Sequence, residues 1–274
     1  STILHELIRQ KIVRYAEYKK RLILFEGTDI NIEEEITNAG LVVPKPINFV
    51  DDLRLYFNNR VSPVKAYYYH RGTPRYFEYQ LLSEPQGIIP VGDVDGFVQM
   101  IFANNGKEYE KLVEFSKNCE HAIIFAFFNN TDELVEHLYN IQKYRYIIEK
   151  VLVDKSDRVA LKEVTQLMEY EKTLLNKTLS ESLYTDSDDV VWLYKGEVKN
   201  ICTQRDFNKL LSTVCEDVYS LTPIINNELF NKHKLSSNIS GAKAKYLQAL
   251  LENSDKPDLG FDKDKFPPEK TIYY

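Results

Sequence analysis

The chain has 274 residues, of which 43% are hydrophobic and 28% charged, which suits about two globular domains and excludes wholesale disorder. Its 35 Lys and Arg against 41 Asp and Glu give a net charge of −6, which excludes a globally basic nucleic-acid binder but not a local basic patch. The sequence holds no apolar run long enough to cross a membrane and no signal-type segment, and its three cysteines are too widely spaced for a disulfide framework. These features predict a cytoplasmic protein without a membrane partner.

Residues 1–60 predict a helical N-terminal segment. Apolar side chains recur every three to four positions over 3–24, which is typical of an amphipathic helix, and basic residues occupy its other face. A second helix is expected over 28–40, because acidic residues follow its capping position and Gly40 can end it. A third helix is expected over about 47–59.

Residues 61–200 predict a mixed α/β region with a central, partly parallel sheet and helices on both faces. The aromatic runs 65–70 and 75–80, separated by the loop Arg71–Pro74, favour a β-hairpin. The run His121–Phe128 is almost wholly apolar, which is typical of a strand that is covered on both faces.

Strand and helix patterns alternate between residues 97 and 140, which favours parallel pairing. Helical periodicity then continues through 131–184 and predicts a long helical hairpin. A strand at 190–194 and a turn at Lys195-Gly196 follow. The last part, 201–274, predicts a helical segment that ends in an extended loop. Its helices are expected at 203–219, 226–232 and 237–253, and the loop at 254–270.

The sequence contains neither of the two glycine-rich phosphate-binding motifs, and its five histidines show no metal-ligand spacing. Asp93 and Asp95, in the run Gly92–Gly96, are weak metal candidates, because two carboxylates alone do not complete a calcium loop. A solvent-exposed turn is the alternative. No catalytic residue is therefore assigned, and whether the chain is an enzyme stays open.

Two features favour nucleic-acid contact. In the aromatic hairpin 65–80, Tyr76 can stack on a base while Arg71 and Arg75 meet phosphates, although aromatic side chains in a sheet also serve as core pairs. The stretch 229–251 carries four lysines and no acidic residue, and its helix-turn-helix pattern can dock on a backbone. A solvated charged face is the alternative. The four lysines are Lys232, Lys234, Lys243 and Lys245.

Five runs combine glycine or proline with charged residues: Leu24–Glu33, Gly72–Glu78, Gly92–Gly96, Pro223–Lys232 and Phe266–Tyr273. Together they resemble the middle of very large bacterial P-loop ATPases of phage-defence operons, the BrxC and PglY type of BREX systems. In that family an N-terminal domain holds the nucleotide site. The resemblance therefore implies ATP and Mg²⁺ in a parent protein, no cofactor in this segment, and no catalytic residue to carry over.

The chain begins at Ser1 without an initiator Met and stops within a β-prone run, so we expect a piece of a larger protein. The favoured interpretation is a non-catalytic internal segment of such an ATPase that couples nucleotide state to other domains of the parent, to other defence-system subunits, or to DNA. Two alternatives stay open. One is a nucleic-acid-binding module that uses 65–80 and 229–251, and the other is a nuclease-like enzyme with an unrecognised site. Salt-dependent DNA binding and metal-dependent cleavage, respectively, are their tests.

Overall fold

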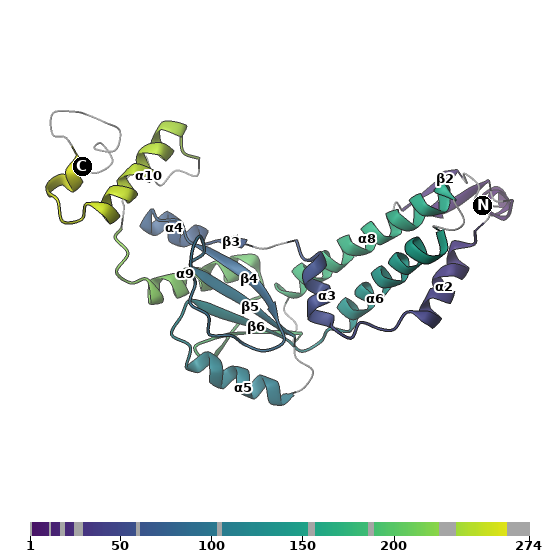
Figure 1. Cartoon of the computed structure of the whole chain (residues 1–274), viewed down its shortest axis with the longest axis horizontal. Helices are drawn as coiled ribbons and strands as arrows, with labels where there is room; N and C mark the ends of the chain where they lie inside the picture. The colour runs from purple at the N-terminus through teal and green to yellow at the C-terminus, as the bar shows by residue number, and fades with distance from the viewer. Residues whose placement is uncertain are drawn as a thin grey trace.

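The computed structural model describes residues 2–10, 12–16, 20–24, 30–58, 61–102, 106–152, 157–185, 189–224 and 234–261. Its centre is a six-stranded mixed sheet with helices on both faces (Figure 1). A long helical hairpin extends from one end of this sheet, and helix α10 lies at the opposite end. The mixed α/β architecture predicted from the sequence is confirmed.

The first helix is much shorter than predicted. Helix α1 (Thr2–Arg9) is followed by an antiparallel pair, β1 (Val13–Ala16) and β2 (Arg21–Leu24), so the expected helix over 3–24 is wrong beyond Arg9. Lys20 has a φ of 49°, which a right-handed helix excludes. The residues Val13 to Ala16 fit a strand as well as a helix, because a β-branched and an aromatic residue alternate with others over this short run.

The next two helices match the prediction more closely. Helix α2 (Ile32–Val42) begins at Asn31, whose side chain accepts a hydrogen bond from the Glu34 N–H. The capping positions expected near residue 28 lie outside the described residues. The helix also continues past Gly40, so the end expected there is wrong; Pro44 stops it instead, because proline disfavours helical backbone before it. Helix α3 (Phe49–Tyr56) is confirmed.

The β-hairpin predicted over 65–80 is wrong. Its first half forms helix α4 (Lys65–Arg71), which packs on α9 and buries Tyr67 completely. Gly72 ends this helix with a φ of 72°, and its N–H donates to the Tyr68 carbonyl. The second half forms a strand that pairs with residues 61–63. Burial of one helix face has therefore overridden the β propensity of three consecutive tyrosines.

Neighbouring strands of the main sheet are parallel in its middle and antiparallel at its edges. Every side chain of β5 and β6 is buried, so the prediction of a central strand covered on both faces is confirmed. In order across the sheet the strands are β3 (Val61–Pro63), β4 (Tyr76–Leu82), β5 (Gly96–Phe102), β6 (Ile123–Phe128), β7 (Val190–Tyr194) and β8 (Glu197–Lys199).

Two apolar cores lie on the two faces of the sheet. Helix α5 (Gly106–Lys117) covers one face, where Leu112 packs among alternate side chains of β5 and β6. Helix α9 (Gln204–Val218), helices α3 and α4 and the root of the helical hairpin cover the other face. Trp192 is buried in this second core, and its indole N–H donates to the Leu183 carbonyl at 3.1 Å.

The helical hairpin predicted over 131–184 is confirmed. It consists of α6 (Asp132–Tyr146), the π-helical η2 (Ile147–Leu152) and α8 (Arg158–Ser182), with Asp157 capping α8. Helix α8 alone spans about 37 Å at 1.5 Å per residue. The far end of the hairpin packs against α2 through Ala39, Ile147 and Ala160. The strand at 190–194 and its turn at Lys195-Gly196 are also confirmed, and both turn residues have positive φ.

The C-terminal segment is described in part. Helix α10 (Ser237–Glu252) matches the expected helix at 237–253, and a short 3₁₀ turn, η3 (Pro257–Gly260), falls within the loop expected at 254–270. The helix expected at 226–232 lies outside the described residues, as does the loop from residue 262. The predicted helix-turn-helix arrangement therefore stays a prediction.

Candidate functional site

Arg71 and Arg75 lie where α4 ends and β4 begins, and both contact residues near the end of α9. The Arg71 Nε donates to both Glu216 carboxylate oxygens, at 3.0 and 3.1 Å, and its Nη1 donates to the Thr222 carbonyl at 2.8 Å. The Glu216 carboxylate keeps the pKa of Arg71 raised, and Arg71 in turn lowers the pKa of Glu216. Arg71 thus fastens α4 to α9.

Arg75 occupies a more enclosed position. Its Nη1 donates to Asp95 Oδ1 at 2.6 Å, and its Nη2 donates to Thr222 Oγ1 at 2.9 Å. The guanidinium lies 4.0 Å from the ring centre of Tyr219, whose hydroxyl donates to the Asp95 carbonyl. Within the described part of the chain, the Arg75 Nε is buried without a hydrogen-bond partner. Both arginines therefore hold the sheet, α4 and α9 together.

The two aspartates proposed as weak metal candidates are used differently. Asp95 is occupied, because its carboxylate also accepts from the Tyr76 N–H at 2.9 Å in addition to Arg75. Asp93 is exposed on the loop before β5. Among the described residues, no group of three His, Cys, Asp or Glu side chains is arranged to hold a metal ion. Asp95 accordingly serves as the carboxylate partner of Arg75.

Three of the residues predicted for nucleic-acid contact line one cavity. Arg75, Tyr76 and Lys243 come together where α4 and β4 face α10, around a space of about 310 Å³ that we call the Lys243 cavity. Lys243 reaches over the Tyr68 ring, with 4.2 Å between its ammonium nitrogen and the ring centre. Its side chain is 7% exposed, and burial lowers its pKa to about 8.

The other predicted lysines lie elsewhere. Lys245 and Lys234 are exposed and do not line the Lys243 cavity, and Lys232 is outside the described residues. Arg71 also stays away from the cavity lining. The structure thus joins Lys243 of the basic stretch to Arg75 and Tyr76 of the aromatic region, although Lys243 lies 167 residues after Tyr76 in the sequence.

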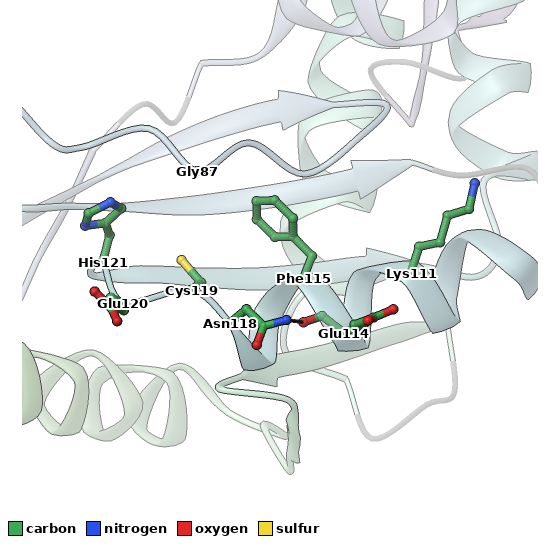
Figure 2. A pocket seen from close by; sticks show the side chains of 8 residues that line it. All are labelled: Gly87, Lys111, Glu114, Phe115, Asn118, Cys119, Glu120 and His121. Carbon is green, nitrogen blue, oxygen red and sulfur yellow. Dashed lines mark hydrogen bonds between the residues drawn. The ribbon is translucent and has the colours of Figure 1, made fainter.

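A second pocket lies between the end of α5 and the start of β6. Figure 2 shows Phe115, Cys119 and His121 along it, with Gly87 of the loop before β5 across from them. The pocket has a volume of about 480 Å³. Burial raises the pKa of the Cys119 thiol, which disfavours the thiolate that nucleophilic chemistry needs. This arrangement therefore gives no support to a cysteine nucleophile.

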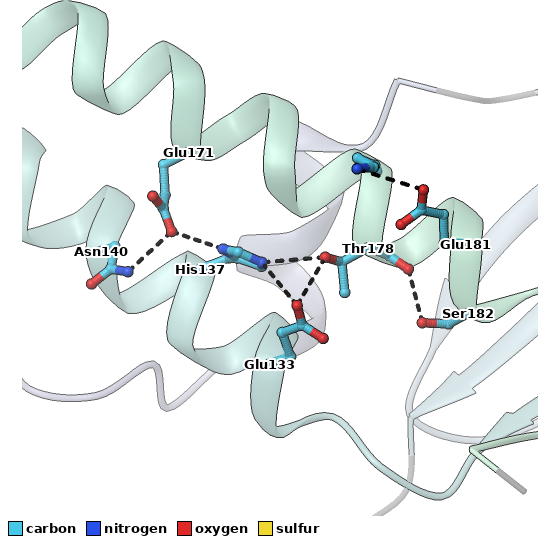
Figure 3. Close-up of polar contacts among 8 residues, drawn as sticks. Glu133, His137, Asn140, Glu171, Thr178, Glu181 and Ser182 are labelled. Carbon is cyan, nitrogen blue, oxygen red and sulfur yellow. Dashed lines mark hydrogen bonds and ion pairs between the residues drawn. The ribbon is translucent and has the colours of Figure 1, made fainter. Parts of the chain in front are cut away.

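A polar network crosses the middle of the helical hairpin (Figure 3). The His137 Nδ1 of α6 lies 2.7 Å from Glu171 Oε1 of α8, and the His137 Nε2 lies 3.3 Å from Thr178 Oγ1. The Asn140 amide also donates to Glu171 at 3.0 Å. The Glu171 carboxylate raises the pKa of His137. The network fixes the two helices in one register.

One feature of the sequence points to this network, although the helical periodicity alone does not identify it. Glu171 stands in the apolar stripe of α8 between Met168 and Leu175, where a hydrophobic side chain is expected. A buried acid at such a position requires a partner, and His137 on the facing helix supplies it. The sequence could not distinguish His137 from the other histidines, because its role depends on which helix faces it.

Comparisons with protein-family models, with curated proteins and with solved structures find no match to this chain. In the described segments, none of the helices has the length and apolar character needed to span a bilayer.

Proposed function

We propose that the chain is a non-catalytic coupling module, an internal segment of a large P-loop ATPase of the anti-phage type that its sequence resembles. In this role it transmits nucleotide state from the ATPase domain of the parent to partner subunits or DNA in the cytoplasm. ATP and Mg²⁺ belong to the parent's own nucleotide domain. The proposal is supported chiefly by how the helical hairpin is rooted in the sheet.

The root of the hairpin and the sheet share one core. Leu134 and Leu138 of α6 and Leu179 of α8 pack in the same cluster as Trp192 of β7. The far end of the hairpin extends beyond the sheet and carries α2. A close-packed core transmits displacement rather than absorbing it. A force on the far end of the hairpin therefore reaches the sheet.

The opposite end of the sheet is equally well fastened. Arg71 and Arg75 tie α4, the loop before β5 and α9 to one another through charge-assisted hydrogen bonds. The Tyr194 hydroxyl adds a link from β7 to Asp217 of α9 at 2.6 Å. The sheet thus joins two ends, each of which is held by side-chain contacts, as a coupling element requires.

The test uses the full-length parent with a loosened hairpin. Glu171→Ala removes the link between α6 and α8, and Glu169→Ala, an exposed position on the same helix, is the matched control. We expect the first variant to hydrolyse ATP at the parental basal rate but to lose stimulation by its partner subunits or DNA, and the control to keep both. Unchanged stimulation in Glu171→Ala, or ATP hydrolysis by the isolated chain, would overturn the proposal.

A further inference from the structure

The walls of the Lys243 cavity suit a flat, largely apolar group. Val64, Leu235, Tyr68 and Tyr76 are among the residues that line it, and the cavity is at the small end of the range for ligand pockets. Tyr76 is 40% exposed, so its ring is available to a group that enters from solvent. Tyr68 is covered by Lys243 on its ring. The volume fits one ring system with its substituent.

The charge at the cavity is positive. Lys65 and Lys243 both line it, and none of the described residues that line it is acidic. The cavity also lies beside the N-terminal part of α10, where Ser236 caps the helix and Ser240 lines the wall. The first acidic residue of α10 is Glu252, at its last position. The cavity therefore attracts an anionic group next to a flat one.

We propose that the Lys243 cavity binds one nucleotide of a single-stranded nucleic acid, with the unpaired base stacked on Tyr76 and its phosphate at Lys243 and Lys65. A base stacked on an aromatic ring beside a cation is the usual means of binding single strands without sequence preference. The same chemistry is offered by a free mononucleotide, which the experiment separates. This inference goes beyond the coupling role proposed above and does not depend on it.

Burial of Lys243 fits this assignment. Its ammonium is desolvated, so the pKa falls to about 8, and an incoming phosphate restores the favourable environment of the charged form. Binding is therefore expected to weaken as the pH rises from 7 to 9. Tyr68 and Lys65 face Lys243 from α4, Tyr76 and Arg75 face it from β4, and Arg75 is already paired with Asp95. The lowered pKa of Lys243, about 8, lies within this range.

The experiment measures fluorescence anisotropy of the intact chain with a labelled twelve-residue oligonucleotide and calorimetry with adenosine monophosphate. Tyr76→Leu and Lys243→Gln change the cavity, and the matched controls Tyr69→Ala and Lys245→Gln change exposed neighbours on α4 and α10. We expect Tyr76→Leu to weaken oligonucleotide binding by about 5- to 100-fold. Lys243→Gln should flatten the log–log salt slope by about 0.7 and abolish the loss of affinity between pH 7 and 9.

The possible results of these measurements distinguish a single-strand site from a mononucleotide site and from no site. Oligonucleotide binding much tighter than that of the mononucleotide, lost in both cavity variants and retained in both controls, supports the single-strand assignment. If adenosine monophosphate binds as tightly as the oligonucleotide and the same variants lose this binding, the cavity is a site for a free mononucleotide, and the single-strand assignment is wrong. Binding of neither probe, tighter binding of a duplex than of a single strand, or equal losses in the controls would overturn the proposal. Circular dichroism melting of every variant identifies any loss that comes from unfolding.

Discussion

The central sheet and the helical hairpin are both built around buried apolar side chains, but different interactions fix their registers. In β6 each of the six side chains is at most 3% exposed, so any shift in register would move apolar surface and break ladder hydrogen bonds. The hairpin adds a polar link, from His137 to Glu171, between otherwise apolar stripes. A charged side chain would destabilise the buried strand β6, whereas the charged Glu171 side chain helps to hold the two helices of the hairpin together.

The largest effect is expected from a charge in the middle of the sheet. Phe125 is fully buried, and its ring contacts Phe115 of α5 edge to face at 5.8 Å. Phe125→Asp would bury an unpaired carboxylate and should lower the free energy of unfolding by more than about 4 kcal/mol, which unfolds most domains. Urea unfolding followed by circular dichroism measures this. Phe125→Leu, the control, should cost less than about 1.5 kcal/mol. A cooperatively folded Asp variant of near-parental stability would show that the centre of the sheet accepts a charge, contrary to this prediction.

A smaller but clear loss is expected where β5 begins. A Cβ added at Gly96 would lie 2.5 Å from the Ala122 carbonyl oxygen and would also clash with the Phe77 ring. Gly96→Ala should therefore lower the free energy of unfolding by about 1–3 kcal/mol, because a close-packed sheet must shift to accept a methyl group. Gly241→Ala on α10 is the control, since its Cβ meets no heavy atom within 4 Å and alanine favours the helix. Equal melting temperatures of the two variants would show that the sheet yields at this point.

Cutting the polar link of the hairpin should lower the free energy of unfolding by a comparable amount. Glu171→Ala removes the hydrogen-bonded carboxylate that His137 and Asn140 share, and we expect the free energy of unfolding to fall by about 1.5–3 kcal/mol. Glu169, which pairs with Lys172 on the exposed side of α8, should cost less than about 0.5 kcal/mol when replaced by alanine. Hydrogen exchange of α6 and α8 amides would locate the loss. Equal protection in the two variants would remove the network as a determinant of the hairpin.

The smallest effect is expected from a change of pH acting on the polar link of the hairpin. The pKa of His137 is raised by Glu171, so its stabilising charge is fully present below the unfolded value of about 6.5 and is lost as the pH rises through the folded value. Glu133 and Glu136 of α6 act in the same direction, and Thr178 of α8 faces the other ring nitrogen. The stability difference between the parental chain and His137→Gln should thus shrink from pH 6 to pH 8. A constant difference would contradict the raised pKa.

Much of the sheet was predictable because its signals are local. The apolar run that ends at Phe128 predicts a strand that is covered on both faces, and the alternation of strands and helices favours parallel pairing. The hairpin was equally predictable, since α8 keeps one apolar stripe over 25 residues. The turn at Lys195-Gly196 follows from glycine's tolerance of positive φ.

Other features were decided only by tertiary structure. The tyrosines of α4 are helical because Tyr67 is buried against α9, a partner about 145 residues away that no local pattern identifies. The same packing pairs Arg71 with Glu216 and Arg75 with Asp95, which no spacing in the sequence indicates. The Lys243 cavity exists because α10 returns to α4 and β4. The sequence by itself determined the elements with a long, uniform pattern, such as β6 and α8, since their apolar runs and stripes are local properties. Which side chains share a site depended on long-range packing, since contacts between distant segments leave no spacing in the chain.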